Sequence, residues 1–222
     1  MSKLYIVPTP IGNLEDITLR AIQILKTVDL VLAEDTRKTG ILLKKYKLEK
    51  KVLSHHSYNE HKFAGKLALR ISAGETMALL TEAGTPGISD PGFLLVRECL
   101  KNGVGIESLP GPTAFVPALV ASGLPCDRFC FEGFLPQKKG RQKRLDELKT
   151  ERRTMIFYES PHRVKKSLEQ FAGIFGPDRQ ACLARELTKI HEEYIRGDLS
   201  VILTELQGRE LKGECIILVG GQ

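Results

Sequence analysis

The sequence predicts two successive α/β domains, the first built on a sheet rich in parallel strands and the second on a mixed sheet. Short apolar runs alternate with segments of helical period through the first half of the chain, which is the pattern of β-α-β units. After about residue 112 the pattern changes to an aromatic-rich strand, a basic segment and two short strands that could pair with each other. The chain has 222 residues, 42% of them hydrophobic, which is enough for one large core or two small ones. The predicted domains are residues 1–112 and 113–222.

The first domain is expected to contain strands at residues 3–7, 30–34, 76–80 and 104–110. Amphipathic segments between them predict helices at residues 16–29, 61–74 and 91–102. Asp16 and Asp90 stand where an N-cap is preferred, and Pro91 follows at a first helical position. Strands and helices in this alternation predict a parallel sheet that is covered on both faces.

The second domain is expected to begin with a short buried helix at residues 112–122. Strands follow at residues 127–135, 154–158, 181–186, 191–197 and 213–221. A polar helix after the basic segment is expected, with further helices at residues 160–176 and 198–208, the former capped by Ser160. The last strand is apolar throughout, which predicts a central place in its sheet.

Three loops rich in glycine and proline follow predicted strands: "PTPIGN" (8–13), "EAGTPGISDPG" (82–92) and "PGPTA" (110–114). Ligands of open α/β sheets bind at the edge where the parallel strands end. Glycine allows backbone to approach a ligand closely, and proline fixes the direction of the peptide groups. The three loops therefore predict a ligand cleft formed largely by main chain. Tight strand-to-helix turns are the alternative interpretation, and it is weakest for the second loop because that loop is longer than its connection needs.

The net charge of +6 and the pI near 9.0 favour an anionic partner such as RNA or a phosphorylated ligand. The most basic segment is "KKGRQKR", and lysine and arginine neutralise phosphates without reading sequence. Its candidate RNA-binding residues are Lys138, Lys139, Arg141, Lys143 and Arg144. A solvated loop with no ligand is the alternative for this segment.

Five scattered cysteines without a CxxC pair argue against a zinc site, and no metal is expected. Buried free thiols in a reducing compartment are the better interpretation. The N-terminal residues lack the apolar core of a signal peptide, and no apolar run reaches the ~20 residues of a membrane span. A soluble, cytoplasmic protein is expected.

Eight segments carry a resemblance to a known family. They are "LYIVPTPIGNLEDITLRA", "LVLAEDTRKTGILL", "AGTPGISDPG", "LPGPTA", "ASGLPCDRFCFEGFLP", "IFYESPHR", "ARELTKIHEEYIRG" and "KGECIILVGG". Through them the chain resembles the tetrapyrrole methylase superfamily, and within it the branch that methylates a ribose 2′-hydroxyl of small-subunit ribosomal RNA. The resemblance runs over nearly the whole chain. Any one of these segments would be weak evidence for the family, but all eight in the same order are strong evidence.

The resemblance implies a tetrapyrrole methylase-like fold with S-adenosyl-L-methionine bound in a cleft between the two α/β domains. It assigns to that cofactor Ile11, Gly84, Thr85, Ile88, Thr113, Ala114, Tyr158, Ala184 and Cys215. Thr85 stands where relatives that act on tetrapyrroles carry an aspartate, which argues against a porphyrin-like acceptor. The implied partner is 16S ribosomal RNA or the small ribosomal subunit, with a cytidine near the decoding site as acceptor, and a homodimer is implied as well.

Two departures from the family pattern limit these expectations. Many members of the RNA branch carry a C-terminal extension beyond the position of Gln222, so RNA contacts are expected from the two core domains or from a dimer. A family segment with two histidines is "HHSYNE" here, where Tyr58 replaces the second histidine. A catalytic role of that histidine is therefore in doubt.

Methyl transfer to a ribose hydroxyl calls for alignment of donor and acceptor and for a general base or a polarising cation. Polar clusters directly after predicted strands supply the catalytic candidates Glu34, Glu159, His162, Arg185 and Glu186. Each cluster pairs a carboxylate with a cation, and a structural salt bridge at the strand end is at least as good an interpretation for any one of them.

Two alternative functions stay open on these grounds. One is a related tetrapyrrole methylase-type enzyme with a small-molecule acceptor, which Thr85 and the basic segment disfavour. The other is an RNA-binding module that has lost the methyl donor, which the intact glycine-rich loops disfavour.

Overall fold

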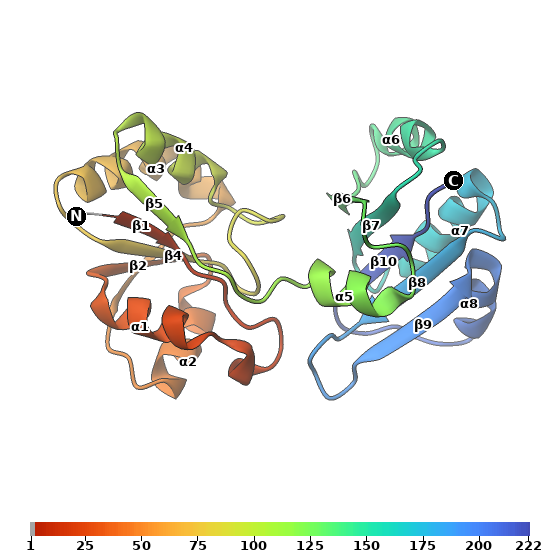
Figure 1. Cartoon of the computed structure of the whole chain (residues 1–222), viewed down its shortest axis with the longest axis horizontal. Helices are drawn as coiled ribbons and strands as arrows, with labels where there is room; N and C mark the ends of the chain where they lie inside the picture. Colours follow the sequence, from red (N-terminus) through yellow and green to blue (C-terminus); the bar gives the residue numbers. More distant parts are fainter. Residues whose placement is uncertain (1–2) are drawn as a thin grey trace. The chain divides into compact units, whose positions relative to one another are not determined.

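The computed structural model describes residues 3–222 and divides after Thr113 into two compact units, one residue beyond the predicted boundary. Each unit contains one five-stranded sheet with helices packed on it (Figure 1). The N-terminal sheet is entirely parallel and the C-terminal sheet is mixed, so the predicted fold class is confirmed.

The N-terminal sheet has the strand order β3-β2-β4-β1-β5. Its strands are β1 (Lys3–Ile6), β2 (Leu30–Ala33), β3 (Lys51–Ser54), β4 (Met77–Leu80) and β5 (Gly105–Ser108). Every residue of β2 and β4 is buried, as expected for inner parallel strands that are covered on both faces.

Helices cover both faces of this sheet (Figure 1). They are α1 (Leu19–Thr27), α2 (Thr36–Lys45), α3 (Ser57–Ser72) and α4 (Phe93–Lys101), with a short 3₁₀ helix, η1 (Leu14–Asp16), before α1. Alternate strand residues point to opposite faces, so Leu79 packs in the core beneath α3 and α4 while Leu80 packs beneath α1 and α2.

Two predicted helix caps of the N-terminal unit are wrong, those of α1 and α4. Thr18, not Asp16, caps α1, because its side chain accepts a hydrogen bond from the amide of Ala21 at 3.0 Å. Helix α4 begins at Phe93, and Asp90 is not its cap. Instead Oε1 of the buried Glu60 accepts hydrogen bonds from the helix-end amides of Gly92, Leu94 and Leu95 at 2.9–3.2 Å.

The C-terminal sheet has the strand order β6-β7-β10-β8-β9. Its strands are β6 (Phe129–Phe134), β7 (Thr154–Glu159), β8 (Gln180–Arg185), β9 (Glu193–Asp198) and β10 (Cys215–Val219). Strands β6 and β7 are parallel, and the remaining pairs are antiparallel. Both predictions for this sheet are confirmed, since β8 pairs with β9 and the apolar β10 lies at the centre.

Three helices pack on one face of this sheet around a single core: α6 (Arg141–Leu148), α7 (Val164–Phe175) and α8 (Leu199–Glu205). The N-cap residue of α7 is Arg163, so the prediction that Ser160 caps this helix is wrong. Helix α5 (Phe115–Ser122) lies against the other face. It is tied there because the side chains of Tyr194 and Arg196 in β9 donate to the α5 carbonyls of Pro117 and Ala121.

Candidate functional site

Three loops meet where the adjacent strands β4, β1 and β5 end. The amide of Thr9, after β1, donates to the carbonyl of Gly84, after β4, and the amide of Gly84 donates back to Thr9, both at 2.9 Å. The hydroxyl of Thr85 donates to the carbonyl of Pro112 at 3.0 Å and lies 2.6 Å from the hydroxyl of Thr113, both after β5. The sheet order therefore brings together the loops that the sequence singles out.

Gly84 occupies the centre of this junction with φ at +85°, a conformation that glycine adopts without strain. A Cβ at this position would lie 3.6 Å from Cγ2 of Ile11 and 3.9 Å from the Pro112 carbonyl oxygen. Ile88 closes the same loop through its amide, which donates to the carbonyl of Thr85 at 3.2 Å. The predicted donor residues Ile11, Gly84, Thr85, Ile88 and Thr113 thus form one cluster of backbone, hydroxyl and aliphatic groups.

The predicted donor residues of the C-terminal unit do not share one face. Tyr158 and Ala184 both pair with Ile216 of β10 and so point to the same side of the sheet. Cys215 is one residue away along β10 and points to the opposite side, into the core beneath α6, α7 and α8. Ala114 immediately precedes α5 as its N-cap residue. The side chain of Cys215 is consequently separated from those of Tyr158 and Ala184 by the sheet.

Three carboxylates gather after β2 and β4. Burial raises the pKa of Glu34, and the charge of Glu82 adds to this effect. Burial together with the charges of Glu34 and Glu82 raises the pKa of Asp90 to about 7. Sequence reasoning missed Asp90 because it treated this residue as a helix cap. Its position in the glycine-rich loop, near carboxylates that follow a neighbouring strand, was the available signal.

Glu159 lies at the end of β7 and is 5% exposed. Its carboxylate accepts hydrogen bonds from the hydroxyl of Ser167 at 2.6 Å and from the amide of Ser160 at 2.9 Å. Arg163 and Arg141 place guanidinium nitrogens 2.9 and 3.6 Å from its oxygens. These contacts place Glu159 in a buried cluster with two arginines, and they occupy the carboxylate that the sequence offers as a catalytic candidate.

The remaining candidates of the C-terminal unit lie in separate surroundings. Arg185 pairs with Glu193 of β9 at 3.0 Å. Glu186 accepts hydrogen bonds from Lys189 at 2.8 Å and from the amide of Glu214 at 3.0 Å, and these bonds outweigh the effect of burial and lower its pKa. His162 is exposed in the turn before α7.

The basic segment divides into two kinds of side chain. Lys138, Lys139 and Lys143 are exposed. Arg141 is buried, where its guanidinium donates to Gln170 at 2.8 Å and to Ser167 at 2.7 Å. Arg144 is half-buried and pairs with Glu132 and Glu147. Only the three lysines therefore present an uncompensated charge to solvent among the five candidates.

Within residues 3–222, histidine, cysteine, aspartate and glutamate nowhere form a group of three or more that could hold a metal ion. In the same part of the chain, every helix is too short or too polar to span a membrane.

Comparison with known families gives a match to the model of the tetrapyrrole (corrin/porphyrin) methylases over residues 3–202. A Thermotoga maritima protein named ribosomal RNA small subunit methyltransferase I is 44% identical over 222 residues, covering 100% of both chains. A protein of the same name from Escherichia coli O157:H7 is 48% identical over 224 residues, covering 99% of this chain and 78% of that protein.

Solved structures with the same fold include a cobalamin biosynthetic enzyme, cobalt precorrin-4 methyltransferase, with a TM-score of 0.70 at 21% identity. That match covers 99% of this chain and 95% of the other. Uroporphyrin-III-C-methyltransferase from Thermus thermophilus gives a TM-score of 0.66 at 21% identity, with 99% and 94% covered. At this level of identity the likeness concerns the fold alone.

Proposed function

The chain belongs to the tetrapyrrole methylase family, as its sequence segments predict, and from this premise we propose that it transfers a methyl group from S-adenosylmethionine to small-subunit ribosomal RNA. The similarity over nearly the whole of this chain to two proteins named for that activity, at 44% and 48% identity, supports the RNA substrate. The observation that carries the donor site is the junction of three loops around Gly84.

The residues of this junction fit a methyl donor. Thr85 and Thr113 offer hydroxyls, Ile11 and Ile88 offer aliphatic contacts, and Gly84 carries no side chain between them. Tyr158, Ala184 and Ala114 are the proposed contacts from the second domain, with Cys215 restricted to its main chain because its side chain lies in the core. S-adenosylmethionine supplies an electrophilic methyl group on a sulfonium when it is bound.

A proton must leave the acceptor hydroxyl, and Glu34 and Asp90 are the groups suited to take it. A general base works best when its pKa lies near the working pH, and the pKa of Asp90 is raised to about 7. Glu34 is half-buried beside it with a raised pKa of its own. In this proposal Glu159 positions α7 through its arginine and serine partners, and His162, Arg185 and Glu186 stay catalytic candidates at the strand ends.

The finer proposal is 2′-O-methylation of a ribose, at a cytidine near the decoding site of 16S ribosomal RNA, by a cytoplasmic homodimer. The family resemblance supports each of these points. A small-molecule acceptor is the competing function, and Thr85 in place of the aspartate of tetrapyrrole-acting relatives disfavours it.

Donor binding is tested by calorimetric titration with S-adenosylmethionine. The protein is expected to bind one donor per chain, and Thr85→Val is expected to weaken binding about tenfold because the loops lose two hydrogen bonds. Thr204→Val is the matched control, since its hydroxyl also donates to a backbone carbonyl, at 2.9 Å in α8. Equal donor affinity in all three proteins would remove the loop junction from the donor site.

The RNA substrate is tested by mass mapping of small-subunit ribosomal RNA from a deletion strain, with and without the protein restored. One nucleotide is expected to gain the mass of a single methyl group, on its ribose, when the protein is present. Unchanged RNA, together with methylation of a porphyrin-like compound, would support the competing function instead.

A further inference from the structure

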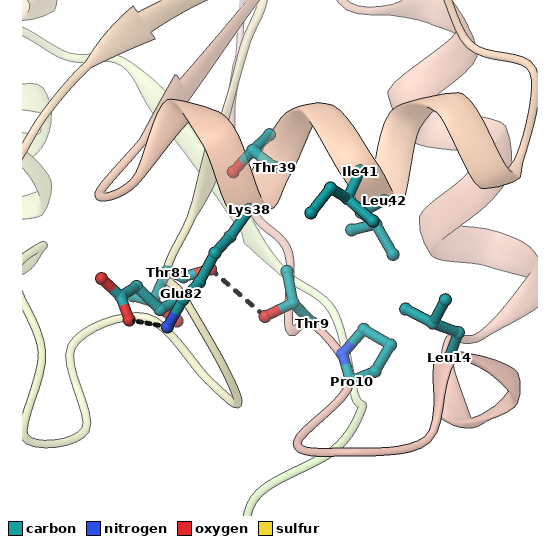
Figure 2. A pocket seen from close by; sticks show the side chains of 9 residues that line it. All are labelled: Thr9, Pro10, Leu14, Lys38, Thr39, Ile41, Leu42, Thr81 and Glu82. Carbon is teal, nitrogen blue, oxygen red and sulfur yellow. Dashed lines mark hydrogen bonds and ion pairs between the residues drawn. The ribbon is translucent and has the colours of Figure 1, made fainter.

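A pocket of about 190 Å³ lies between α2 and the ends of β1 and β4 (Figure 2). Helix α2 contributes one wall, the loop after β1 contributes a second, and the first residues after β4 contribute the rim. The lining residues are Thr9, Pro10, Leu14, Lys38, Thr39, Ile41, Leu42, Thr81 and Glu82. All of them belong to the N-terminal unit.

The walls and the rim of this pocket differ in chemistry. Pro10, Leu14 and Ile41 present aliphatic surfaces that face the opening (Figure 2). Lys38 and Glu82 form an ion pair at the rim, where their side chains are 58% and 41% exposed. Such a pocket suits a flat ring with hydrogen-bonding groups along its edge, since the faces of the ring need apolar contacts and the edge needs a donor and an acceptor.

The volume of the pocket limits the size of the ring that it can hold. An aliphatic cavity of about 150 Å³ accommodates a benzene ring. A pocket of about 190 Å³ therefore has room for one six-membered ring with its exocyclic groups.

The pocket shares a wall with the candidate donor site. Thr9 lines the pocket, and its backbone exchanges two hydrogen bonds of 2.9 Å with Gly84. The hydroxyl of Thr9 donates to the carbonyl of Thr81, the residue that links the pocket rim to the glycine-rich loop (Figure 2). Glu82 at the rim also lies within electrostatic reach of Glu34 and Asp90. A substituent on a ring bound in this pocket would therefore lie near Gly84 and near the carboxylates of Glu34 and Asp90.

We propose that this pocket receives the base of the nucleotide to be methylated, a pyrimidine turned out of its stack, so that its ribose stands at the pocket mouth beside Gly84. The inference rests on the proposed function, because it assigns the acceptor side of the same reaction. Glu82 accepts a hydrogen bond from the exocyclic amine of a cytosine, and Lys38 donates to its carbonyl oxygen. Pro10, Leu14 and Ile41 contact the faces of the base, as apolar side chains do in sites that hold an extruded base.

Filling the pocket tests this assignment without touching the donor loop. Ile41→Phe places a ring where the base would lie, and the 64% exposure of Ile41 makes the change compatible with folding. Leu69→Phe is the matched control, since Leu69 is 60% exposed on α3 and does not line the pocket. Single-turnover methylation of the small subunit is measured together with donor affinity by calorimetry.

Ile41→Phe is expected to lower the methylation rate about tenfold or more while donor affinity stays within about twofold of the wild type, and Leu69→Phe is expected to change neither. A second variant, Glu82→Gln, is expected to reduce the preference for cytosine over uracil at the mapped nucleotide, because an amide can donate as well as accept. The substrates are small subunits reconstituted with either base at that position.

The outcomes separate the pocket from the proposed function. Wild-type turnover in Ile41→Phe would overturn the pocket assignment and leave the methyltransferase intact. A loss of donor affinity in step with the rate would overturn it too, because the pocket would then belong to the donor. Absence of transfer to RNA by the wild-type protein itself would remove the proposed function, and the pocket assignment with it.

Discussion

The protonation of Asp90 makes the stability of the fold depend on pH. Its ordinary pKa is 3.8, and burial beside Glu34 and Glu82 raises the pKa in the folded protein to about 7. The folded state therefore holds this proton more tightly than the unfolded state does, so ionisation of Asp90 destabilises the fold as the pH rises from about 4 through 7.

Replacing Asp90 with asparagine removes this dependence. Asp90→Asn is expected to be more stable than the wild type at pH 8, and the difference in melting temperature is expected to shrink towards pH 4, where the aspartate is protonated in both states. Thermal unfolding between pH 4 and pH 8 measures it, with the exposed Asp178→Asn as control. A difference that is constant over this range would show that Asp90 titrates normally.

Glu159 offers a second prediction for a single side chain. Two guanidinium groups and a serine hydroxyl are directed at its buried carboxylate, and removing the negative charge leaves the buried Arg141 without compensation. Glu159→Gln is expected to lower the free energy of unfolding on the order of 3 kcal/mol. Denaturant unfolding measures this loss, while turnover per folded molecule is expected to stay near that of the wild type.

The control for the Glu159 variant is a change in a solvent-exposed ion pair on helix α6. Glu147 pairs with Arg144 at 2.9 Å and is 46% exposed. Glu147→Gln is expected to cost at most about 1 kcal/mol, because exposed pairs contribute little. Unchanged stability of Glu159→Gln together with a collapse of turnover would return Glu159 to the catalytic group.

At the scale of a secondary-structure element, α4 depends on a cap from another helix. Glu60 in α3 accepts three amide hydrogen bonds from the first turn of α4, and its negative charge faces the positive end of the helix dipole. Glu60→Ala is expected to destabilise the protein by about 2 kcal/mol in denaturant unfolding, since three amides lose their acceptor. Glu60→Gln keeps an acceptor oxygen and is expected to lose less stability. Equal losses of stability in both variants would mean that Glu60 acts through packing and not through capping.

The same helix shows why some element boundaries escape prediction from sequence. The Asp90-Pro91 pair has the local signature of a helix start, yet the actual cap, Glu60, lies 32 residues before Gly92. A contact of that separation exists only after α3 and α4 pack together. In the segment "HHSYNE" the contact is local instead, since Asn59 accepts a hydrogen bond from the amide of His56, three residues before it, at the start of α3. Tyr58 is 96% exposed.

The three glycine-rich loops could be predicted because glycine and proline act on the backbone locally. Glycine and proline after an apolar run mark the end of a parallel strand, and parallel strand ends share one edge of the sheet. The side of the sheet on which Cys215 lies could not be obtained in this way, because it depends on the register of β10 against β7. The burial of Arg141 depends likewise on the packing of α6 against Ser167 and Gln170 of α7.

For the whole molecule, the net charge of +6 matters through the cations that have no internal partner. Arg141 and Arg144 of the basic segment are engaged with groups of the protein itself, so they are expected to contribute little to the proposed RNA binding. Lys138, Lys139 and Lys143 are exposed, and they are the members of the segment that can neutralise phosphates.

Replacing Lys138, Lys139 and Lys143 with alanine is therefore expected to weaken RNA binding for all sequences alike. The slope of log affinity against log salt is expected to fall by about 2, because each lost phosphate contact on single-stranded RNA contributes roughly 0.7. Donor affinity is expected to stay unchanged. Filter binding between 50 and 200 mM salt, roughly the range in which such slopes are well determined, measures the effect. The control removes the same charge elsewhere, with alanine at the exposed Lys44, Lys45 and Lys47. If both triple variants flatten the slope equally, net charge rather than the basic segment governs RNA binding, and the contact surface must be sought on another part of the molecule.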